Sequence, residues 1–589
     1  PAAAMTGVLT KTFLLGVATF ALLHTGAEGS EMCSCFYIRS EWEGNYDADF
    51  SVQSTIRFKG ITCELTFDSP VDSLNYWQGS VEMVDSTHFI LTNEIYSAEP
   101  GDDIEFGIEV HYSGATQPVI TGVILNGDDV CDGVGDWSTP QPMENPCAET
   151  GMTPYDYSQV LCMSYVFYEA QRSGKLPADQ RVTWRGDSAL DDGSDVGHDL
   201  TGGYYDAGDH VKFGFPMAYT ATVLAWGLID FAKGHQTANQ VEYGQAAVKW
   251  ATDYFLKAHT AHFEFYGQVG EGNADHAYWG RPEEMTMARP SYKIDSSAPG
   301  SDLAAETAAA LAAASIVFKE VDSAYASQML TVAEELYAFA DEDRDVYSNS
   351  ITDAASFYKS WSGYGDELCW GALWLYRATG DEAYLEKARA AWDEFSLGTD
   401  AVQFAWDDKR AGCYALFTLL QPDTAEYKNS LESFLDYILN EAPYTPQGMV
   451  FLDTWGANRH AANVAFIALW AAEYGNTDHT ATYREFAETQ INILLGDSGH
   501  SFVVGYGVNP PQRPHHRSSS CPWPPADCTD GWAQQQPGPN PHVLFGALVG
   551  GPSEDGTYSD DRNDYVHNEV ACDYNAAFTG ALAALVELH

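Results

Sequence analysis

The chain has 589 residues, 45% of them hydrophobic and 13% aromatic, and a formal net charge of −55 at pH 7. Its length exceeds that of one ordinary domain, so we expect at least two, with a large core. A chain this acidic repels nucleic acids and anionic membrane surfaces, so we expect neither as a partner, whereas an uncharged polymer remains compatible.

In chain order, the first predicted element is a signal peptide over residues 5–30. Met5 and Lys11 precede an apolar run at 13–23, and small residues follow. The run is too short to span a membrane, and we expect no later segment of about 18 apolar residues. The prediction is a secreted, extracellular monomer without a membrane anchor.

The cysteine content agrees with an oxidising compartment. Eleven cysteines predict several disulfides and, because the number is odd, at least one free thiol. Cys521 and Cys528, seven positions apart in a Pro-rich loop, are the first choice for a local pair.

Residues 31–131 alternate between polar and apolar positions, in short runs broken by Gly, Pro, Asn and Asp. This pattern predicts a small all-β sandwich. Residues 132–153 contain Gly, Pro, Ser and Thr with few apolar residues, which predicts a linker.

From residue 154 to 589 the periodicity becomes helical. Twelve helices are predicted, at 156–171, 216–233, 239–259, 302–319, 324–340, 366–379, 381–396, 410–420, 425–441, 458–475, 480–495 and 573–588. Aromatic stripes such as Trp370, Leu373 and Trp374 indicate packing between helices. Twelve helices in one domain suggest six hairpins in a closed ring, with the chemistry on the long loops.

Residues 203–209 read Gly-Tyr-Tyr-Asp-Ala-Gly-Asp and place two carboxylates, Asp206 and Asp209, in one turn. Two such groups can converge on one water, although Asp and Gly are also typical of a capped helix start. Glu569 lies in an apolar, aromatic context, where a carboxyl group can stay protonated. A base that activates water and an acid that protonates a leaving oxygen are the groups that inverting glycoside hydrolysis requires.

Three long segments, at 185–214, 501–517 and 558–576, carry a resemblance to glycoside hydrolase family 9, the secreted endoglucanases. The resemblance covers 154–589. It implies an (α/α)6 barrel that cuts internal β-1,4-glucosidic bonds of cellulose with inversion and needs no cofactor for catalysis. It also implies that Asp209 is the general base, that Asp206 helps to hold the water, and that Glu569 is the general acid.

Further site residues follow from the same resemblance. His515 and Arg517 would bond sugar hydroxyls beside the cleavage point, with metal ligation the less favoured alternative for His515 because no second His or Cys has zinc-site spacing. Asp560 would support the acid, through Arg517. Sugar-binding positions, each with core packing as the alternative, are His276, Trp279, Tyr358, Trp361, Trp455, Arg459 and Tyr574.

A possible structural calcium site also matches the family. Its ligands would come from Ser362, Gly363, Asp366, Glu367 and Asp407, because calcium prefers oxygen ligands. The alternative is a helix N-terminus stabilised by acidic residues.

The N-terminal sandwich resembles a family 2 carbohydrate-binding module. The resemblance implies that Trp42, Trp77 and Tyr96 present a flat aromatic strip to polysaccharide, and that Cys33 or Cys35 bonds to Cys131. Two positions depart from the pattern: Cys63 replaces a buried Trp, and Tyr96 replaces another Trp.

Alternatives to a cellulase remain open at this stage. The same groups would serve on mixed-linkage β-glucan or xylan, because substrate choice depends on loop shape. A non-catalytic sugar-binding protein is disfavoured because all three carboxylates are present. An acidic matrix protein would show repeats, and none are found.

Overall fold

The computed structural model describes residues 30–135, 137, 141–399, 401–529 and 531–589, so the predicted signal peptide lies outside the described residues. The chain divides into two compact units between residues 138 and 139, and each unit is described by itself.

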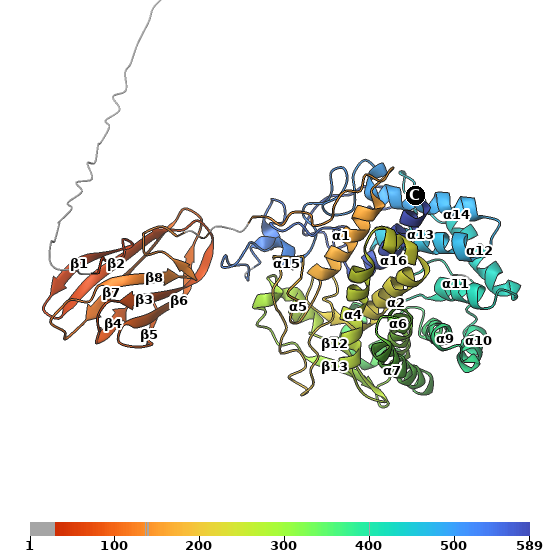
Figure 1. Cartoon of the computed structure of the whole chain (residues 1–589), viewed down its shortest axis with the longest axis horizontal. Coiled ribbons are helices and arrows are strands. Elements are labelled where there is room, and N and C mark those ends of the chain that lie inside the picture. The colour runs from red at the N-terminus through yellow and green to blue at the C-terminus, as the bar shows by residue number, and fades with distance from the viewer. Residues whose placement is uncertain (1–29, 136, 138–140, 400, 530) are drawn as a thin grey trace, which may run out of the picture. The chain divides into compact units, whose positions relative to one another are not determined.

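The N-terminal unit is a β-sandwich of two antiparallel sheets, as predicted (Figure 1). One sheet has the order β1 (Phe36–Trp42), β2 (Asn45–Gln53), β7 (Asp103–His111) and β4 (Ser73–Tyr76). The other has the order β5 (Ser80–Met83), β6 (His88–Ala98), β3 (Phe58–Phe67), β8 (Ile120–Leu125) and β9 (Asp128–Asp129). The alternating pattern explains this packing, since every second residue of β2 from Tyr46 to Val52 is buried.

Two features of this unit resolve or correct the sequence analysis. Cys33, and not Cys35, forms the disulfide with Cys131. The unit extends beyond the predicted boundary at 131, because the ring of Trp137 packs edge-on against Phe58 in the core, with centroids 4.9 Å apart.

The C-terminal unit contains all twelve predicted helices. Six of them contact one another in a closed ring: α2 (Gly214–Asp230), α6 (Ser301–Phe318), α9 (Gly365–Thr379), α11 (Arg410–Leu420), α13 (Ala457–Tyr474) and α16 (Cys572–Leu588). Six further helices pack around the ring: α1 (Tyr157–Ala170), α4 (Val241–Ala258), α7 (Ser323–Glu342), α10 (Glu382–Glu394), α12 (Ala425–Asn440) and α14 (Thr480–Asn492). This is an (α/α)6 barrel (Figure 1).

Shorter elements lie in the connections. They are α3 (Ala232–Thr237), α5 (Gly272–Ala277), α8 (Tyr347–Ser350), α15 (Arg517–Ser520), β10 (Lys212–Phe213), β11 (His259–Ala261), β12 (Glu264–Val269) and β13 (Ser291–Asp295). The last four strands form one small sheet in which β12 pairs with the other three.

The two sets of helices differ in composition because they differ in environment. In α10 one face is buried, through Leu385, Ala388, Ala391 and Trp392, whereas nearly every residue of α6 is buried. The mean hydropathy of α6 reaches 1.3 over 18 residues, so the expectation of no second long apolar segment was wrong. Since 89% of that segment is buried inside the protein, its composition is that of a core helix.

Aromatic rings fill the centre of the barrel. Trp226 packs edge-on against Trp370, with centroids 5.5 Å apart, and against Phe466, with centroids 5.0 Å apart. The buried indole N–H groups of Trp226 and Trp470 both donate to Asp230 Oδ2, at 2.7 and 2.8 Å. The predicted stripe in α9 is therefore core packing: Trp370 and Trp374 are buried, and the Trp370 indole N–H donates to Glu306 at 3.4 Å.

The predicted linker is shorter than 132–153. A disulfide that the sequence did not reveal joins Cys147 to Cys162 of α1, and the Thr150 hydroxyl donates to Asp156 at 2.7 Å. This end of the segment is therefore fixed to the helical unit. The predicted pair Cys521–Cys528 is confirmed, and the five remaining cysteines are free and buried.

Candidate active site

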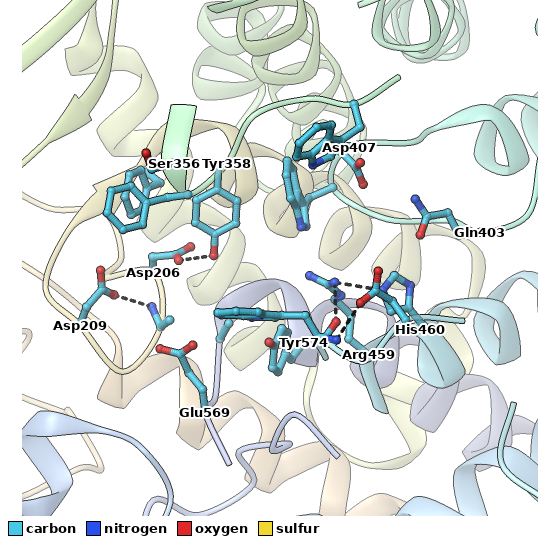
Figure 2. Close-up of a pocket in the computed structure, with 18 of the residues that line it drawn as sticks. Asp206, Asp209, Ser356, Tyr358, Gln403, Asp407, Arg459, His460, Glu569 and Tyr574 are labelled. Atoms are coloured by element: carbon cyan, nitrogen blue, oxygen red, sulfur yellow. Dashed lines mark hydrogen bonds between the residues drawn. The ribbon is translucent and has the colours of Figure 1, made fainter. Parts of the chain in front are cut away.

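A cleft of about 590 Å³ opens in the helical unit (Figure 2). Nine residues predicted for catalysis or sugar binding line it: Asp206, Asp209, His276, Tyr358, Trp361, Trp455, Arg459, Glu569 and Tyr574. Figure 2 shows the three carboxylates gathered at one end of the cleft, with Arg459, His460 and Gln403 toward the other end. Segments more than 300 positions apart in the chain thus supply one site.

The turn that carries Asp206 and Asp209 is fixed on both sides by backbone contacts. The N–H of Arg517 donates to the Gly208 carbonyl at 3.0 Å, and the N–H of Cys572 donates to the Asp206 carbonyl at 2.8 Å. A Cβ at position 208 would lie 2.1 Å from the His515 carbonyl oxygen, so glycine is required for this approach. The Gly in the motif therefore brings the two aspartates against residues 515–517, at the start of α15.

The two aspartates have different surroundings. Asp209 Oδ1 accepts the Ala207 N–H at 3.1 Å. Asp206 Oδ2 accepts the Tyr358 hydroxyl, while its buried Oδ1 has no hydrogen-bond partner. Burial, and then the charge of Asp209, raise the pKa of Asp206 well above its usual range. Like charges at short range disfavour double ionisation, and this repulsion adds to the effect of burial on Asp206.

Glu569 has the electrostatic character of an acid. Its side chain is half-buried, and desolvation followed by the nearby Asp209 charge raises its pKa to about 8, against a smaller opposing effect of Arg517. It is therefore protonated at neutral pH and can donate a proton to a leaving oxygen.

His515 and Arg517 lie behind the cleft wall. The His515 Nδ1 lies 2.7 Å from the Arg562 carbonyl, so Nδ1 carries the proton, and burial lowers the pKa of His515 to about 4. The Arg517 Nε donates to the Tyr278 carbonyl at 2.9 Å. Neither residue lines the cleft volume, and both contact the elements that hold Asp209 and Glu569.

Trp279 and Asp560 are placed differently from the prediction. Trp279 is buried, donates to Ser520 Oγ at 2.9 Å and lies beneath the Arg517 guanidinium, so its role is core packing and not sugar stacking. Asp560 accepts N–H groups from Gln512 and Arg513 and the Asn568 amide at 3.0 Å. Its contact with the acid therefore runs through Asn568, the neighbour of Glu569, and not through Arg517.

Two tryptophans of the cleft are open to solvent. Trp361 is 77% exposed and Trp455 is 46% exposed, which is unusual for indole rings that have no ligand to cover them. The Arg459 guanidinium pairs with Asp573 at 2.8 Å and lies 5.2 Å from the Tyr574 ring centroid. A flat sugar ring could stack on such surfaces while its hydroxyls bond the polar groups between them.

Several lining residues were missed by the sequence analysis: Phe213, Ser356, Phe357, Gln403, Trp406, Asp453 and His460. Asp275, whose Oδ1 accepts the His210 N–H at 3.1 Å, was also missed. Asp275 directly precedes the predicted His276, so the sequence could have indicated it as a site residue. The others are scattered over distant loops and the ends of short elements and helices, where no spacing rule points to a cleft.

Three of the predicted calcium residues, Ser362, Asp366 and Asp407, contact one another, whereas the Glu367 carboxylate pairs with Lys409 at 3.1 Å. The Ser362 hydroxyl contacts both Asp366 Oδ2, at 3.3 Å, and the Asp407 carbonyl, and the Gly363 carbonyl accepts the Ser360 hydroxyl. Glu367 Oε2 is buried without a hydrogen-bond partner. This oxygen-rich set with an unpaired carboxylate oxygen fits a hard cation. The Asp407 side chain lines the cleft, so only its carbonyl belongs to the cluster.

In the sandwich, two predicted aromatic residues lie on the outer face of one sheet. Trp42 is 45% exposed and lies opposite Asn45 of the neighbouring strand. Trp77 is 63% exposed and directly follows Tyr76, which lies opposite Ile108. Tyr37, 58% exposed and missed by the sequence analysis, lies in the same cross-strand row as Asp49 and Gly107. Tyr96 instead packs partly against the core, and its hydroxyl accepts the Glu105 N–H at 3.1 Å.

Comparison with known proteins agrees with this architecture. Residues 157–582 match the sequence model of Glycosyl hydrolase family 9, and the chain belongs to that family. Residues 34–141 match the model described as Serine protease gd N-terminus, so a binding role for the sandwich is taken up below as a proposal.

Individual relatives share the helical unit. Endoglucanase B of Cellulomonas fimi is 52% identical over 451 residues, which make up 74% of this chain but 42% of that protein. The structure of an endoglucanase from the termite Nasutitermes takasagoensis is 60% identical, with a TM-score of 0.72, over 74% of this chain and 100% of that chain. The cellulase Cel9M of C. cellulolyticum, solved in complex with cellobiose, is 38% identical, with a TM-score of 0.69, over 74% of this chain and 100% of that chain.

Proposed function

We propose that this protein is a secreted endo-β-1,4-glucanase that hydrolyses internal bonds of cellulose with inversion of configuration. The observation that carries the proposal is the half-buried Glu569, with a pKa raised to about 8, in the same aromatic-lined cleft as Asp209. Family membership and relatives named as endoglucanases support it. Three disulfides agree with secretion.

The proposed mechanism divides the reaction between two carboxyl groups. Glu569 donates its proton to the glycosidic oxygen as the bond to the leaving chain breaks. Asp209 takes a proton from a water that attacks the anomeric carbon from the opposite face, and this single displacement inverts the configuration. Asp206, held by the Tyr358 hydroxyl, orients the same water.

Substrate binding in this proposal depends on both walls of the cleft. Trp361, Trp455 and Tyr574 stack on glucose rings, and His276 and Arg459 bond hydroxyl groups. His515, Arg517 and Asp560 hold the segments that carry the acid and the base.

The proposal is tested by incubating the protein with soluble carboxymethylcellulose and following viscosity together with new reducing ends. A steep early fall in viscosity with few new ends is expected, because each internal cut halves a long chain. Unchanged viscosity and no new ends would contradict the cellulase proposal. The assay would then be repeated on mixed-linkage β-glucan and xylan, and inactivity on both would point to a binding protein.

We further propose that the cluster of Ser362, Gly363, Asp366, Glu367 and the Asp407 carbonyl holds a structural calcium ion. Bound calcium would neutralise carboxylates buried at the start of α9 and so stabilise the folded state. Chelation should lower the melting temperature, and added calcium but not magnesium should restore it. An unchanged melting temperature after exhaustive chelation would contradict the proposal.

A further inference from the structure

The cleft contains a cluster that the acid–base mechanism does not fully use. One ligand atom from each of Asp209, Asp275 and His276 lies within 4.8 Å of the other two. Within the described residues, no other set of three His, Cys, Asp or Glu side chains converges in this way. The cluster is open to the cleft through His276, whereas both aspartates are buried.

Backbone contacts hold these side chains in place while leaving ligand atoms free. The His276 Nδ1 lies 2.6 Å from the Gly272 carbonyl, which can only accept, so the proton is on Nδ1 and the lone pair is on Nε2. Asp275 Oδ1 accepts the His210 N–H, and its Oδ2 is buried without a hydrogen-bond partner. A histidine whose tautomer is fixed by a carbonyl is the usual arrangement at a metal site.

The charge around the cluster also favours a cation. Arg289 lies 4.0 Å from Asp275 Oδ2 but is already paired with Asp192 at 2.7 Å. Arg517 adds positive charge nearby, and against it Asp209 lies close to the acidic Asp275 and Glu569. Two neighbouring buried carboxylates repel each other, and a bound divalent ion would remove that repulsion.

We propose that Asp209, Asp275 and His276 form an inhibitory binding site for a borderline divalent transition-metal ion, with Zn²⁺ as the representative. Two carboxylate oxygens and one imidazole nitrogen are a donor set that zinc accepts, and three protein ligands leave a fourth position for water. Calcium binds all-oxygen sites and gains little from the imidazole. The binding is independent of the proposed function. The inhibition rests on it, because the ion would bind the carboxylate of Asp209, the proposed base.

The binding is tested by isothermal titration of the full chain with ZnCl₂ at neutral pH, in excess CaCl₂ to occupy surface carboxylates. One binding event is expected, weakened at least about tenfold in His276→Gln and in Asp275→Asn. The matched control is His262→Gln, an exposed histidine outside the cleft that should leave the affinity unchanged. Circular dichroism establishes that each variant is folded.

The inhibition is tested on hydroxyethylcellulose, a neutral polymer that does not bind the ion. Zn²⁺ should abolish turnover at the concentrations that fill the site, and EDTA should restore it. Equal zinc affinity in the wild type and His276→Gln would overturn the site, and so would the absence of binding. Binding that depends on His276 without loss of turnover would overturn the inhibition. Binding that depends on His276 in a chain that never hydrolyses glucan would support the site and contradict the proposed function instead.

Discussion

At the scale of single residues, the surroundings of Glu569 give it the character of the proposed acid. Desolvation, and then the charge of Asp209 in the same cleft, raise the pKa of Glu569 to about 8. Both groups depend on the close approach at Gly208, which brings the aspartate turn against the His515 carbonyl. The chemistry thus follows from where the fold places ordinary carboxyl groups, not from unusual ones.

Replacing Glu569 with its amide directly tests its role as the general acid. Glu569→Gln should fold normally, because the amide is isosteric and neutral like the protonated acid. Hydrolysis of unactivated glucan should fall by roughly 10²–10⁴-fold, the usual contribution of general acid catalysis. Reducing-end assays on cello-oligosaccharides measure the loss, and turnover like that of the wild type would exclude Glu569 as the acid.

The pH dependence of turnover follows from the same group. The acid must carry its proton, so kcat/KM for a neutral soluble glucan should fall as the pH rises through about 8, the pKa of Glu569. This fall in kcat/KM should be absent from the residual activity of Glu569→Gln, because an amide does not titrate. If the kcat/KM of the wild type instead fell as the pH rises through 4.5, the ordinary pKa of Glu, the pKa of Glu569 would not be shifted by its surroundings.

At the scale of elements, a buried ion cluster joins three helices of the inner ring. Lys409, which precedes α11, lies 3.4 Å from Glu306 of α6 and 3.1 Å from Glu367 of α9, and all three side chains are fully buried. Lys409→Met should lower the free energy of unfolding by about 3–5 kcal/mol, because two buried carboxylates would lose their cation. Urea unfolding followed by helical circular dichroism measures the change.

A surface pair provides the matched control for this substitution. Lys249 pairs with Asp253 at 2.7 Å, and both side chains are about half exposed. Lys249→Met should cost less than about 1 kcal/mol, because water screens the pair. Similar losses in the two variants would mean that the buried cluster does not stabilise the barrel.

The sequence predicts the elements well, because their pattern is local. Helices such as 302–319 and 366–379 appear at α6 and α9, since Ala-rich and aromatic periodicity reports burial on its own. The Asp206–Asp209 turn was found because its spacing is local too. A partner that acts through a distant contact was not found: Asp573 pairs with the predicted Arg459 across 114 positions, and no spacing rule connects the two.

The burial of side chains was the other source of error in the predicted site residues. Trp279 was predicted as a sugar platform, but its indole donates to Ser520, 241 positions away, and lies in a small core beside the Cys521–Cys528 disulfide. A tryptophan next to a polar motif fits an open cleft and a closed core equally well. Only the three-dimensional contacts distinguish the two, because both roles use the same flat apolar ring.

At the scale of the whole molecule, two units with different surfaces divide the work that we propose. The helical unit holds the cleft, and the sandwich carries Trp42, Trp77 and Tyr37 exposed on one sheet face. Large exposed aromatic rings on one face are costly unless a ligand covers them. A flat, uncharged polysaccharide surface would suit such a face on a chain with a net charge of −55.

Substituting these rings in the full chain separates anchoring from hydrolysis. The double variant Trp42→Ala, Trp77→Ala should adsorb to microcrystalline cellulose roughly tenfold more weakly, because two stacking contacts of about 0.5–1.5 kcal/mol each are lost. Its turnover of soluble glucan should stay within about twofold, since neither residue lines the cleft. Ile95→Ala, an exposed apolar residue of the other sheet, is the control for adsorption. Unchanged adsorption of the double variant would mean that the sandwich does not anchor the enzyme through this face, and binding of intact chains to insoluble cellulose would then have to come from the cleft itself.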